Sequence, residues 1–333
     1  MYSSGILKSE LLALMHVATE PSPSPASSPC PVCGATNSAI AYPHARDYIT
    51  GVEFQVRSCP QCSMAWTSPV PDDLEPHYPR YYRRYNPLVI AVLKFLYKRR
   101  VAQWCKRFPN PGSALELGCG DGFMLNALRG FKWQVAGTER TDEMARFARE
   151  KFGLTIYVES DSPIPAGEKF DLIIMFHVLE HLQDPVAQLQ RAAAHLREGG
   201  AIIVGVPNFA SWQSRYARDQ WINLDVPRHL VHFSPQSIEA AANAAGLTVS
   251  QISFKSFEHD PYSWVQSILN VCCKNRNRLT SLLMRASSWR LSDLITIALA
   301  ALLTPLAITL AMFSWLMGKG AIMESILVQR VAR

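Results

Sequence analysis

The sequence predicts an α/β protein whose main domain is a doubly wound sheet with helices on both faces. Three observations support this fold class. Apolar strand-like segments alternate with helix-like segments from residue 114 to residue 206, and such alternation favours a parallel sheet. A glycine-rich turn follows the first of these strands, and two C-x-x-C pairs precede the alternating region. We therefore expect a small metal-binding ribbon joined to a larger α/β domain.

The composition sets the class of protein. The chain has 333 residues, 48% of them hydrophobic, which is enough for a sizeable core. Its net charge of +6 is spread along the chain, so we expect no nucleic acid partner, because such proteins usually carry a denser basic stripe. The chain starts without a charged and then apolar leader. We expect a reducing, cytoplasmic setting, in which C-x-x-C pairs bind metal rather than form disulfides.

The two cysteine pairs predict a structural zinc site. Cys30 and Cys33 form one pair, Cys59 and Cys62 form the other, and 25 residues separate the pairs. Four thiolates in tetrahedral geometry suit Zn²⁺ and leave it no open position for catalysis. The metal would supply much of the folding energy of so small a unit. An iron or redox site is the alternative.

The elements of the main domain follow in order. A basic helix is expected first, at 87–108, covering the first strand. Apolar runs then predict strands, and segments with helical spacing predict helices. Ser234 or Ser237 caps a helix that Gly246 ends. The expected strands are 114–117, 133–138, 155–158, 170–176, 200–206, 247–257 and 321–330, and the expected helices are 123–129, 142–152, 185–195 and the segment before 245.

The turn after the first strand indicates a ligand that carries positive charge or hydroxyl groups. Gly118, Gly120 and Gly122 permit positive φ and a close approach of a ligand to the backbone. Glu116 and Asp121 make the loop acidic, whereas phosphate-binding loops avoid carboxylates and often bring a lysine. An acid at the end of the second strand, Glu139, is placed to hydrogen-bond ribose hydroxyls.

Together these residues resemble a class I S-adenosylmethionine-dependent methyltransferase, over about residues 110–257. The motifs are E-L-G-C-G-D-G at 116–122, Glu139, Asp161 and F-D-L-I at 170–173. The resemblance implies a Rossmann-like sheet with an antiparallel last strand between the two strands before it. It also implies that Glu116, Gly118 and Gly120 contact the methionine part of the cofactor, Glu139 the ribose, and Asp161, with Glu159, the adenine. Alternatively, Glu139 caps the next helix, and Glu159 and Asp161 are plain loop carboxylates.

The segment H-V-L-E-H at 177–181 follows the fourth strand and would face the cofactor's sulfur in such a fold. A histidine there can remove a proton from an acceptor. We assign His181 as candidate base and Glu180 as the carboxylate that orients it, with His177 in the same catalytic group; a packing cluster is the alternative. The H-x-x-E-H pattern of metalloproteases needs a helix that carries both histidines, and His177 directly follows a strand, so a catalytic metal is not expected.

A second resemblance concerns the segment that ends in P-R-H-L-V-H-F-S at 227–234. It resembles the subgroup of these methyltransferases that carries an N-terminal four-cysteine zinc ribbon. Some relatives methylate carbon atoms of nucleotide-linked sugars, and others methylate oxygen on polyprenyl-linked rings. His229 and His232 are therefore candidates to line the acceptor site, or to form a lid packed by its own hydrogen bonds.

The segment 294–317 contains no charged residue over 24 positions, which is long enough to span a membrane. The predicted last strand returns to the same sheet, however, so a single crossing would place it on the wrong side of the bilayer. Because Pro305 divides the segment, we expect a broken hairpin or helix pair dipping into the cytoplasmic leaflet, with Trp264, Trp289 and Trp315 at the interface and basic head-group contacts. The basic residues are Lys274, Arg276, Arg278, Arg285 and Arg290. A buried helical cap is the alternative.

These inferences divide the chain into an N-terminal segment with a Pro/Ser linker (1–29), a zinc ribbon (30–75), a methyltransferase domain (85–257 plus 320–333) and an apolar insertion (258–319). The predicted function is methyl transfer from S-adenosylmethionine to a sugar, glycolipid or lipid-linked small molecule. We expect a peripheral or monotopic position on the cytoplasmic face of the membrane. The alternative is a non-catalytic recruitment module. The sequence predicts neither the acceptor's identity nor the oligomeric state.

Overall fold

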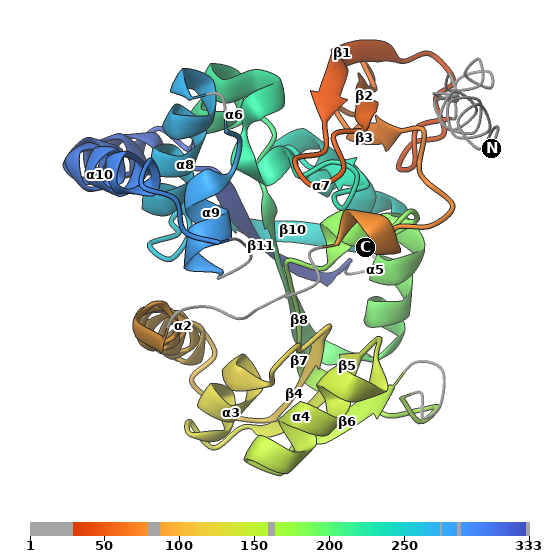
Figure 1. The fold of residues 1–333 in the computed structure, drawn as a ribbon. Coiled ribbons are helices and arrows are strands. Elements are labelled where there is room, and N and C mark those ends of the chain that lie inside the picture. Colours follow the sequence, from red (N-terminus) through yellow and green to blue (C-terminus); the bar gives the residue numbers. More distant parts are fainter. Residues whose placement is uncertain (1–28, 79–86, 159–163, 274, 285–287, 331–333) are drawn as a thin grey trace, which may run out of the picture.

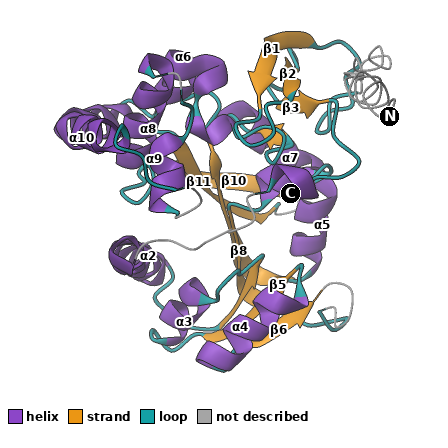
Figure 2. Cartoon of the chain, viewed as in Figure 1, coloured by secondary structure: helices purple, strands orange, loops and turns teal. Residues whose placement is uncertain are grey.

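The computed structural model describes residues 29–78, 87–158, 164–273, 275–284 and 288–330. Its main sheet has seven strands in the order β10-β11-β8-β7-β4-β5-β6 (Figures 1 and 2). β11 pairs antiparallel with both β8 and β10 and lies between them, as the resemblance implied. The strands are β4 (Ser113–Leu117), β5 (Gln134–Glu139), β6 (Thr155–Val158), β7 (Phe170–Phe176), β8 (Leu196–Pro207), β10 (Leu247–Ser253) and β11 (Ile322–Gln329).

The order of the parallel strands reverses between β4 and β7, which pair directly. A ligand site is expected outside the carboxyl ends of the strands at such a switch point. The helices α2 (Pro87–Arg107) and α3 (Phe123–Arg129) cover one face of the sheet, and α5 (Pro185–Ala194) and α7 (Pro235–Ala244) cover the other (Figure 1). α4 (Asp142–Phe152) packs beside β5 and β6.

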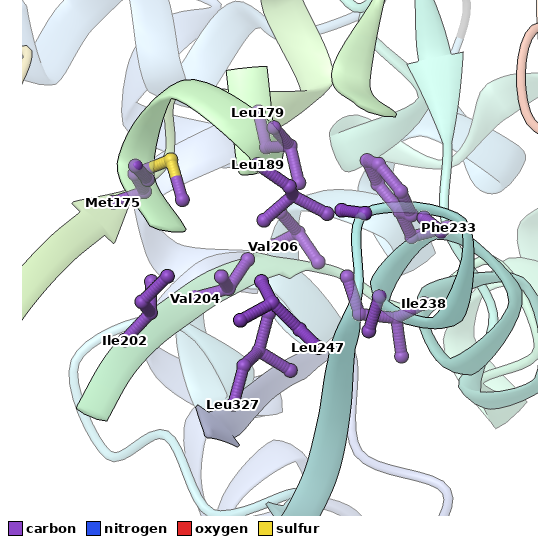
Figure 3. Packing of buried hydrophobic residues seen from close by; sticks show 14 of the residues in the cluster. Met175, Leu179, Leu189, Ile202, Val204, Val206, Phe233, Ile238, Leu247 and Leu327 are labelled. Carbon is purple, nitrogen blue, oxygen red and sulfur yellow. The ribbon is translucent and has the colours of Figure 1, made fainter. Parts of the chain in front are cut away.

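Alternating side chains of the central strands fill the two halves of the core. Ile174 packs in the cluster that contains Trp104 of α2 and Leu128 of α3. Its neighbour Ile173 packs in the opposite cluster, with Leu189 of α5 and Ile238 of α7. Figure 3 shows this second cluster around Leu189 and Val204. Because these strands are buried on both faces, they are continuous apolar runs in the sequence, and those runs predict the βαβ pattern.

Most predicted elements of the main domain are confirmed. α3, α4, β6 and β7 have the predicted bounds, whereas β8 starts four residues earlier than expected and β10 ends at Ser253. The two candidate capping residues act together: the Ser234 hydroxyl accepts from the Ser237 backbone N–H at 3.2 Å, and the Ser237 hydroxyl lies 2.8 Å from the Ser234 backbone N–H. Such a reciprocal capping box satisfies two backbone donors at the start of α7.

The N-terminal ribbon forms a second sheet in the order β1-β2-β3-β9. Its strands are β1 (Ala39–Arg46), β2 (Glu53–Ser58) and β3 (Ala65–Ser68), followed by a 3-10 turn at Glu75–His77. The fourth strand, β9 (Val231–His232), belongs to the main domain, where Ala65 pairs with His232. The ribbon is therefore joined by strand pairing to the segment that carries His229 and His232.

The apolar insertion consists of α8 (Asp260–Cys272), α9 (Arg278–Leu283) and α10 (Asp293–Leu316). α10 is one continuous helix, so the prediction of a hairpin broken at Pro305 is wrong. The fixed φ of Pro305 is itself helical, and the helix continues through it with the loss of one backbone hydrogen bond, while Ala300 and Ala307 pack against α8 and α9 on either side. Shorter helical segments between β8 and β9 are α6 (Trp212–Ala217), η3 (Arg218–Gln220) and η4 (Ile222–Leu224), and η2 (Leu179–His181) follows β7.

Candidate active site

The glycine-rich loop lies at the carboxyl end of β4. Gly118, Gly120 and Gly122 have φ values of 66°, 57° and 70°, a region that favours glycine. A Cβ atom on Gly118 would lie 2.8 Å from Cγ2 of Val178. The loop therefore abuts the segment that follows β7, which brings the candidate cofactor site next to the candidate catalytic residues.

Two acidic side chains border this loop. Glu116 is buried at the end of β4, with 4% of its surface exposed. The Glu139 carboxylate at the end of β5 accepts hydrogen bonds from the backbone N–H of Gly120 at 2.7 Å and of Arg140 at 3.0 Å. The structure thus places the residues assigned to the methionine and ribose parts around one loop. Asp161, with Glu159, lies outside the described residues.

His177 and Glu180 form a hydrogen-bonded pair just after β7. His177 has a φ of 56°, which turns its ring back over the following 3-10 turn. Its Nδ1 lies 2.9 Å from Glu180 Oε1. The Nε2 atom of His177 and the Oε2 atom of Glu180 are both buried and have no hydrogen-bond partner among the described residues. One imidazole nitrogen is therefore held by a carboxylate while the other is available to a ligand.

The charge state of this pair follows from its surroundings. Burial raises the pKa of the Glu180 carboxyl, but the hydrogen bond from His177 and the nearby imidazoles outweigh burial and lower the pKa to about 2. Glu180 is therefore a carboxylate at neutral pH. An anionic carboxylate at Nδ1 favours the tautomer with its proton on that nitrogen, which leaves Nε2 as the acceptor.

His181 makes a different contact from the predicted one. Its Nδ1 lies 2.9 Å from the Arg228 carbonyl oxygen, and Glu180 bonds His177 instead. The assignment of Glu180 as the group that orients His181 is thus corrected: the turned backbone at His177 brings the nearer histidine to the carboxylate. Glu180, His181 and His229 still offer ligand atoms within 4.8 Å of one another, a donor set that could hold a metal ion. The sequence did not indicate that His229 would lie beside Glu180 and His181.

We call the segment 225–234, which carries the buried residues His229 and His232, the lid segment, and both histidines are hydrogen-bonded. His229 Nδ1 lies 2.8 Å from the Asn223 carbonyl oxygen, and His232 Nε2 lies 3.1 Å from the Thr67 hydroxyl of the ribbon. Burial lowers the pKa of His229 to about 4 and that of His232 to about 3. Both are therefore neutral at pH 7. His232 joins the ribbon to the main domain, and the ring of His229 lies 4.8 Å from that of His181.

Sequence reasoning missed one residue at this site. The His259 ring lies 4.7 Å from the His177 ring, although 82 positions separate them. His259 immediately precedes α8, in the insertion for which the sequence predicts only membrane contact. Its Nε2 is buried and has no hydrogen-bond partner within the described ranges. No motif marks this histidine, because only the packing of the insertion on the sheet brings it here.

The four cysteines of the ribbon converge on one point. Their Sγ atoms lie within 4.8 Å of one another, with distances of 3.5 Å for Cys30–Cys62 and for Cys33–Cys59. Tetrahedral Zn–S bonds of about 2.3 Å would give sulfur separations of about 3.8 Å. The two knuckles match each other: the backbone N–H groups of Gly34 and Ser63 donate to the carbonyls of Cys30 and Cys59, both at 3.0 Å. This donor set fits a structural zinc ion.

A mostly parallel seven-stranded sheet with one antiparallel strand, together with an acidic glycine-rich loop at its switch point, defines the methyltransferase class of α/β folds. Residues 85–252 match the family model described as "Methyltransferase domain", and the chain belongs to this family.

Known proteins similar to this chain include ubiquinone biosynthesis O-methyltransferases. The protein of that name from Cereibacter sphaeroides (strain ATCC 17025) is 27% identical over 166 residues, which cover 46% of this chain. The one from Ruegeria pomeroyi is 26% identical over 175 residues. The chain spans 66% of the length of each of these two relatives. Among solved structures, a SAM-dependent methyltransferase from Archaeoglobus fulgidus is 17% identical with a TM-score of 0.44, over 70% of this chain and 93% of that one.

Proposed function

We propose that this chain transfers the methyl group of S-adenosylmethionine to an oxygen atom of a lipid-linked or otherwise amphiphilic small molecule. The observation that carries the proposal is the contact between the glycine-rich loop and the segment of His177 and Glu180, at Gly118 and Val178. Membership of the methyltransferase domain family and the name shared by the relatives, which specifies O-methylation, support it.

The cofactor would be held by the acidic loop. S-adenosylmethionine supplies an electrophilic methyl group on a sulfonium centre, and its methionine amino group is cationic. Glu116, Gly118 and Gly120 are proposed to contact the methionine part, and Glu139 the ribose. Glu139 already bonds the loop backbone, so its carboxylate is held next to the proposed cofactor position. Asp161 is kept as the proposed adenine contact.

We assign the general base to His177, with Glu180 as its positioning residue. The Nδ1 of His177 is held by a carboxylate, which can stabilise an imidazolium, and its Nε2 has no hydrogen-bond partner among the described residues. The Nδ1 of His181 is held by the neutral carbonyl of Arg228 instead. The acceptor hydroxyl would lose its proton to Nε2 as its oxygen attacks the methyl carbon. The Glu180 carboxylate would then stabilise the imidazolium, as the acid does in a Ser-His-Asp triad. His181 remains a member of the proposed site beside Glu180.

The zinc ribbon is proposed to be structural. Its strand β3 pairs with β9, and the Thr67 hydroxyl donates to the His229 carbonyl at 2.7 Å. A bound Zn²⁺ would hold the two knuckles together, since a ribbon of this size buries little apolar surface by itself. Through these contacts the ribbon would keep His229 and His232 in place, with His229 beside His181.

The helix α10 is proposed to lie in the plane of a membrane surface. It is the one helix in the described part of the chain that is long and apolar enough to cross a membrane, with a mean hydropathy of 2.3 and 17% burial over its most apolar window. Buried residues occur along its length, and it packs on α8, where its contacts include Ala300, Ala307 and Trp315. A helix docked lengthwise on the domain presents its other side to lipid without crossing it.

Two details of the predicted membrane contact change. Trp264 and Trp315 are buried, so only Trp289, at 64% exposure, is available to an interface. Arg276 and Arg278 form ion pairs with Asp219 and Asp293, and Lys274 and Arg285 lie outside the described residues. The proposal therefore rests on the exposed apolar residues of α10, the most exposed of which are Leu294, Ile295, Leu302, Leu306, Met312, Phe313 and Leu316.

A labelled-methyl assay tests the proposed function. The full chain is incubated with methyl-labelled S-adenosylmethionine and a bacterial membrane lipid extract, and label is counted in the lipid fraction. We expect transfer by the wild type and a decrease of about 100-fold or more for His177→Phe. His44→Phe, a surface change in the ribbon, serves as control. Cofactor binding without transfer into any extract would contradict the catalytic proposal.

A further inference from the structure

The insertion contributes a second histidine to the candidate active site. His259 packs edge-to-face against His177, with an interplanar angle of 65° and ring centroids 4.7 Å apart. Both rings have a buried Nε2 atom without a hydrogen-bond partner among the described residues. Buried polar atoms are almost always satisfied in folded proteins. Two such nitrogens on touching rings therefore point to a hydrogen-bonding ligand shared between them.

The backbone around His259 is anchored on both sides. Glu258 forms an ion pair with Arg100, which also pairs with Glu324 of β11. Asp260 accepts hydrogen bonds from the Trp315 indole N–H at 2.6 Å and from the backbone N–H of Ile322 at 3.2 Å. These buried contacts fix the position of the histidine between them. A ring held in this way is preorganised to bind a ligand atom.

The surroundings of the two histidines suit an uncharged hydroxyl. Phe176 flanks both rings, at centroid distances of 4.7 Å from His177 and 6.0 Å from His259. Burial, together with His177 and Arg100, holds the pKa of His259 well below its ordinary value, so this imidazole is neutral at pH 7. The His177 side chain is 25% exposed, although its Nε2 is buried, so the pair of rings lies close to the protein surface.

We propose that His259 binds the acceptor hydroxyl together with His177. The hydroxyl oxygen would accept a hydrogen bond from His259 Nε2–H while its proton is donated to His177 Nε2. As the O–H bond breaks, the proton passes to His177 and the oxygen lone pair forms the new bond to the methyl carbon. The carbon–sulfur bond breaks with its electron pair going to sulfur, which becomes a neutral thioether. His259 thereby stabilises the negative charge that develops on oxygen. This inference rests on the proposed methyl transfer.

Binding of a simple hydroxyl probe tests the inference independently of turnover. The full chain, saturated with S-adenosylhomocysteine, is titrated with 4-octylphenol by calorimetry. We expect His259→Phe to weaken octylphenol binding about tenfold, the effect of losing one buried hydrogen bond. His259→Gln retains an N–H donor and should stay within about threefold of the wild type. Neither change should alter the affinity for S-adenosylhomocysteine. His259 makes no side-chain cap at the start of α8, so the fold should tolerate both changes.

The kinetic readout separates this inference from the proposed function. In the lipid-extract assay, His259→Phe should lower kcat by about 100-fold, as expected for loss of one donor to a developing oxyanion, and His259→Gln should recover much of that loss. Equal octylphenol affinity in the wild type and His259→Phe would overturn the inference, as would no binding to the wild type. No methyl transfer by the wild type would instead contradict the proposed function.

Discussion

Asp47 of the N-terminal ribbon accepts a hydrogen bond at 2.9 Å from the guanidinium of Arg228, which lies 181 positions later in the lid of the main domain. Arg228 also pairs with Asp225 at 2.7 Å, and its backbone carbonyl lies against His181. One arginine thus connects the ribbon, the lid and the segment that follows β7. The ribbon is part of the architecture of the site, although it contributes no proposed catalytic residue.

Loss of this arginine should destabilise the fold. Asp47 is fully buried, and although burial raises the pKa of its carboxyl, Arg228 and the hydrogen bonds of Thr50 and His77 outweigh burial and lower it. Arg228→Met would leave the buried Asp47 carboxylate without its guanidinium partner and should lower the free energy of unfolding by about 3–5 kcal/mol, measured by urea denaturation. The control is Arg46→Met, whose partner Glu53 is exposed, and it should change stability little.

Zinc should be bound once per chain by the ribbon. We expect about one zinc ion per chain by elemental mass spectrometry, lost in Cys59→Ser and retained in Cys105→Ser, because Cys105 lies in α2 away from the cluster. The loss should also lower the unfolding temperature, since the metal contributes to folding. A Cys59→Ser variant that keeps its zinc would rule out this ligand set.

Gly118 should be required for cofactor binding. An alanine at position 118 would have to keep a backbone φ of 66°, and its Cβ would clash with Val178. Gly118→Ala should therefore weaken S-adenosylmethionine binding at least tenfold, measured by calorimetry. Gly153→Ala is the matched control. Gly153 has a φ of 60° with no neighbour within 4 Å, so this change should cost about 1 kcal/mol of stability and leave cofactor affinity intact. Equal cofactor affinity in both variants would refute the loop assignment.

The exposed side of α10 should bind lipid vesicles. The wild type should float with vesicles of phosphatidylglycerol and phosphatidylethanolamine, and a double change of Leu302 and Leu306 to Asp should abolish flotation, because charges do not enter the acyl region. Ala300 and Ala307 lie on the buried side of the same helix, so the folded domain should be unaffected, as checked by circular dichroism. A wild type that stays at the bottom of the gradient would exclude the membrane proposal.

Stability should fall in mild acid because of the lid histidines. The pKa values of His229 and His232 are about 4 and 3 in the folded protein, against about 6.5 in the unfolded chain. Between pH 6.5 and about 4 only the unfolded chain binds these protons, so the stability present above pH 6.5 is lost as the pH falls. At pH 5 the loss is about 2 kcal/mol per histidine, measured by urea unfolding. His232→Phe should show a smaller loss between pH 7 and pH 5.

Local patterns made much of this protein predictable. The buried apolar runs of β7 and β8 and the amphipathic spacing of α4 depend on side chains near each other in sequence, so their periodicity reports the fold directly. The positions of Gly118, Gly120 and Gly122 follow from the same logic, since a tight turn needs residues that tolerate positive φ. The paired cysteines are equally local, and the structure brings the two knuckles together.

Contacts between distant segments were not predictable in the same way. The sequence places Glu180 next to His181, yet the backbone at His177 turns so that Glu180 bonds His177 instead. Pro305 indicated a helix break, but α10 continues through it, with Ala300 and Ala307 packed in one cluster on either side. His259 carries no motif and reaches His177 only because its neighbour Asp260, the first residue of α8, is hydrogen-bonded to the start of β11.

The sequence by itself determined the fold class, the glycine-rich loop and the four-cysteine cluster, because each depends on short-range spacing and on the chemistry of single residue types. The tertiary structure decided which histidine the carboxylate of Glu180 holds, which residues surround that histidine, and how the ribbon is joined to the lid segment. Those choices depend on burial and on hydrogen bonds across as many as 181 positions, where the partners are set by packing of the whole chain.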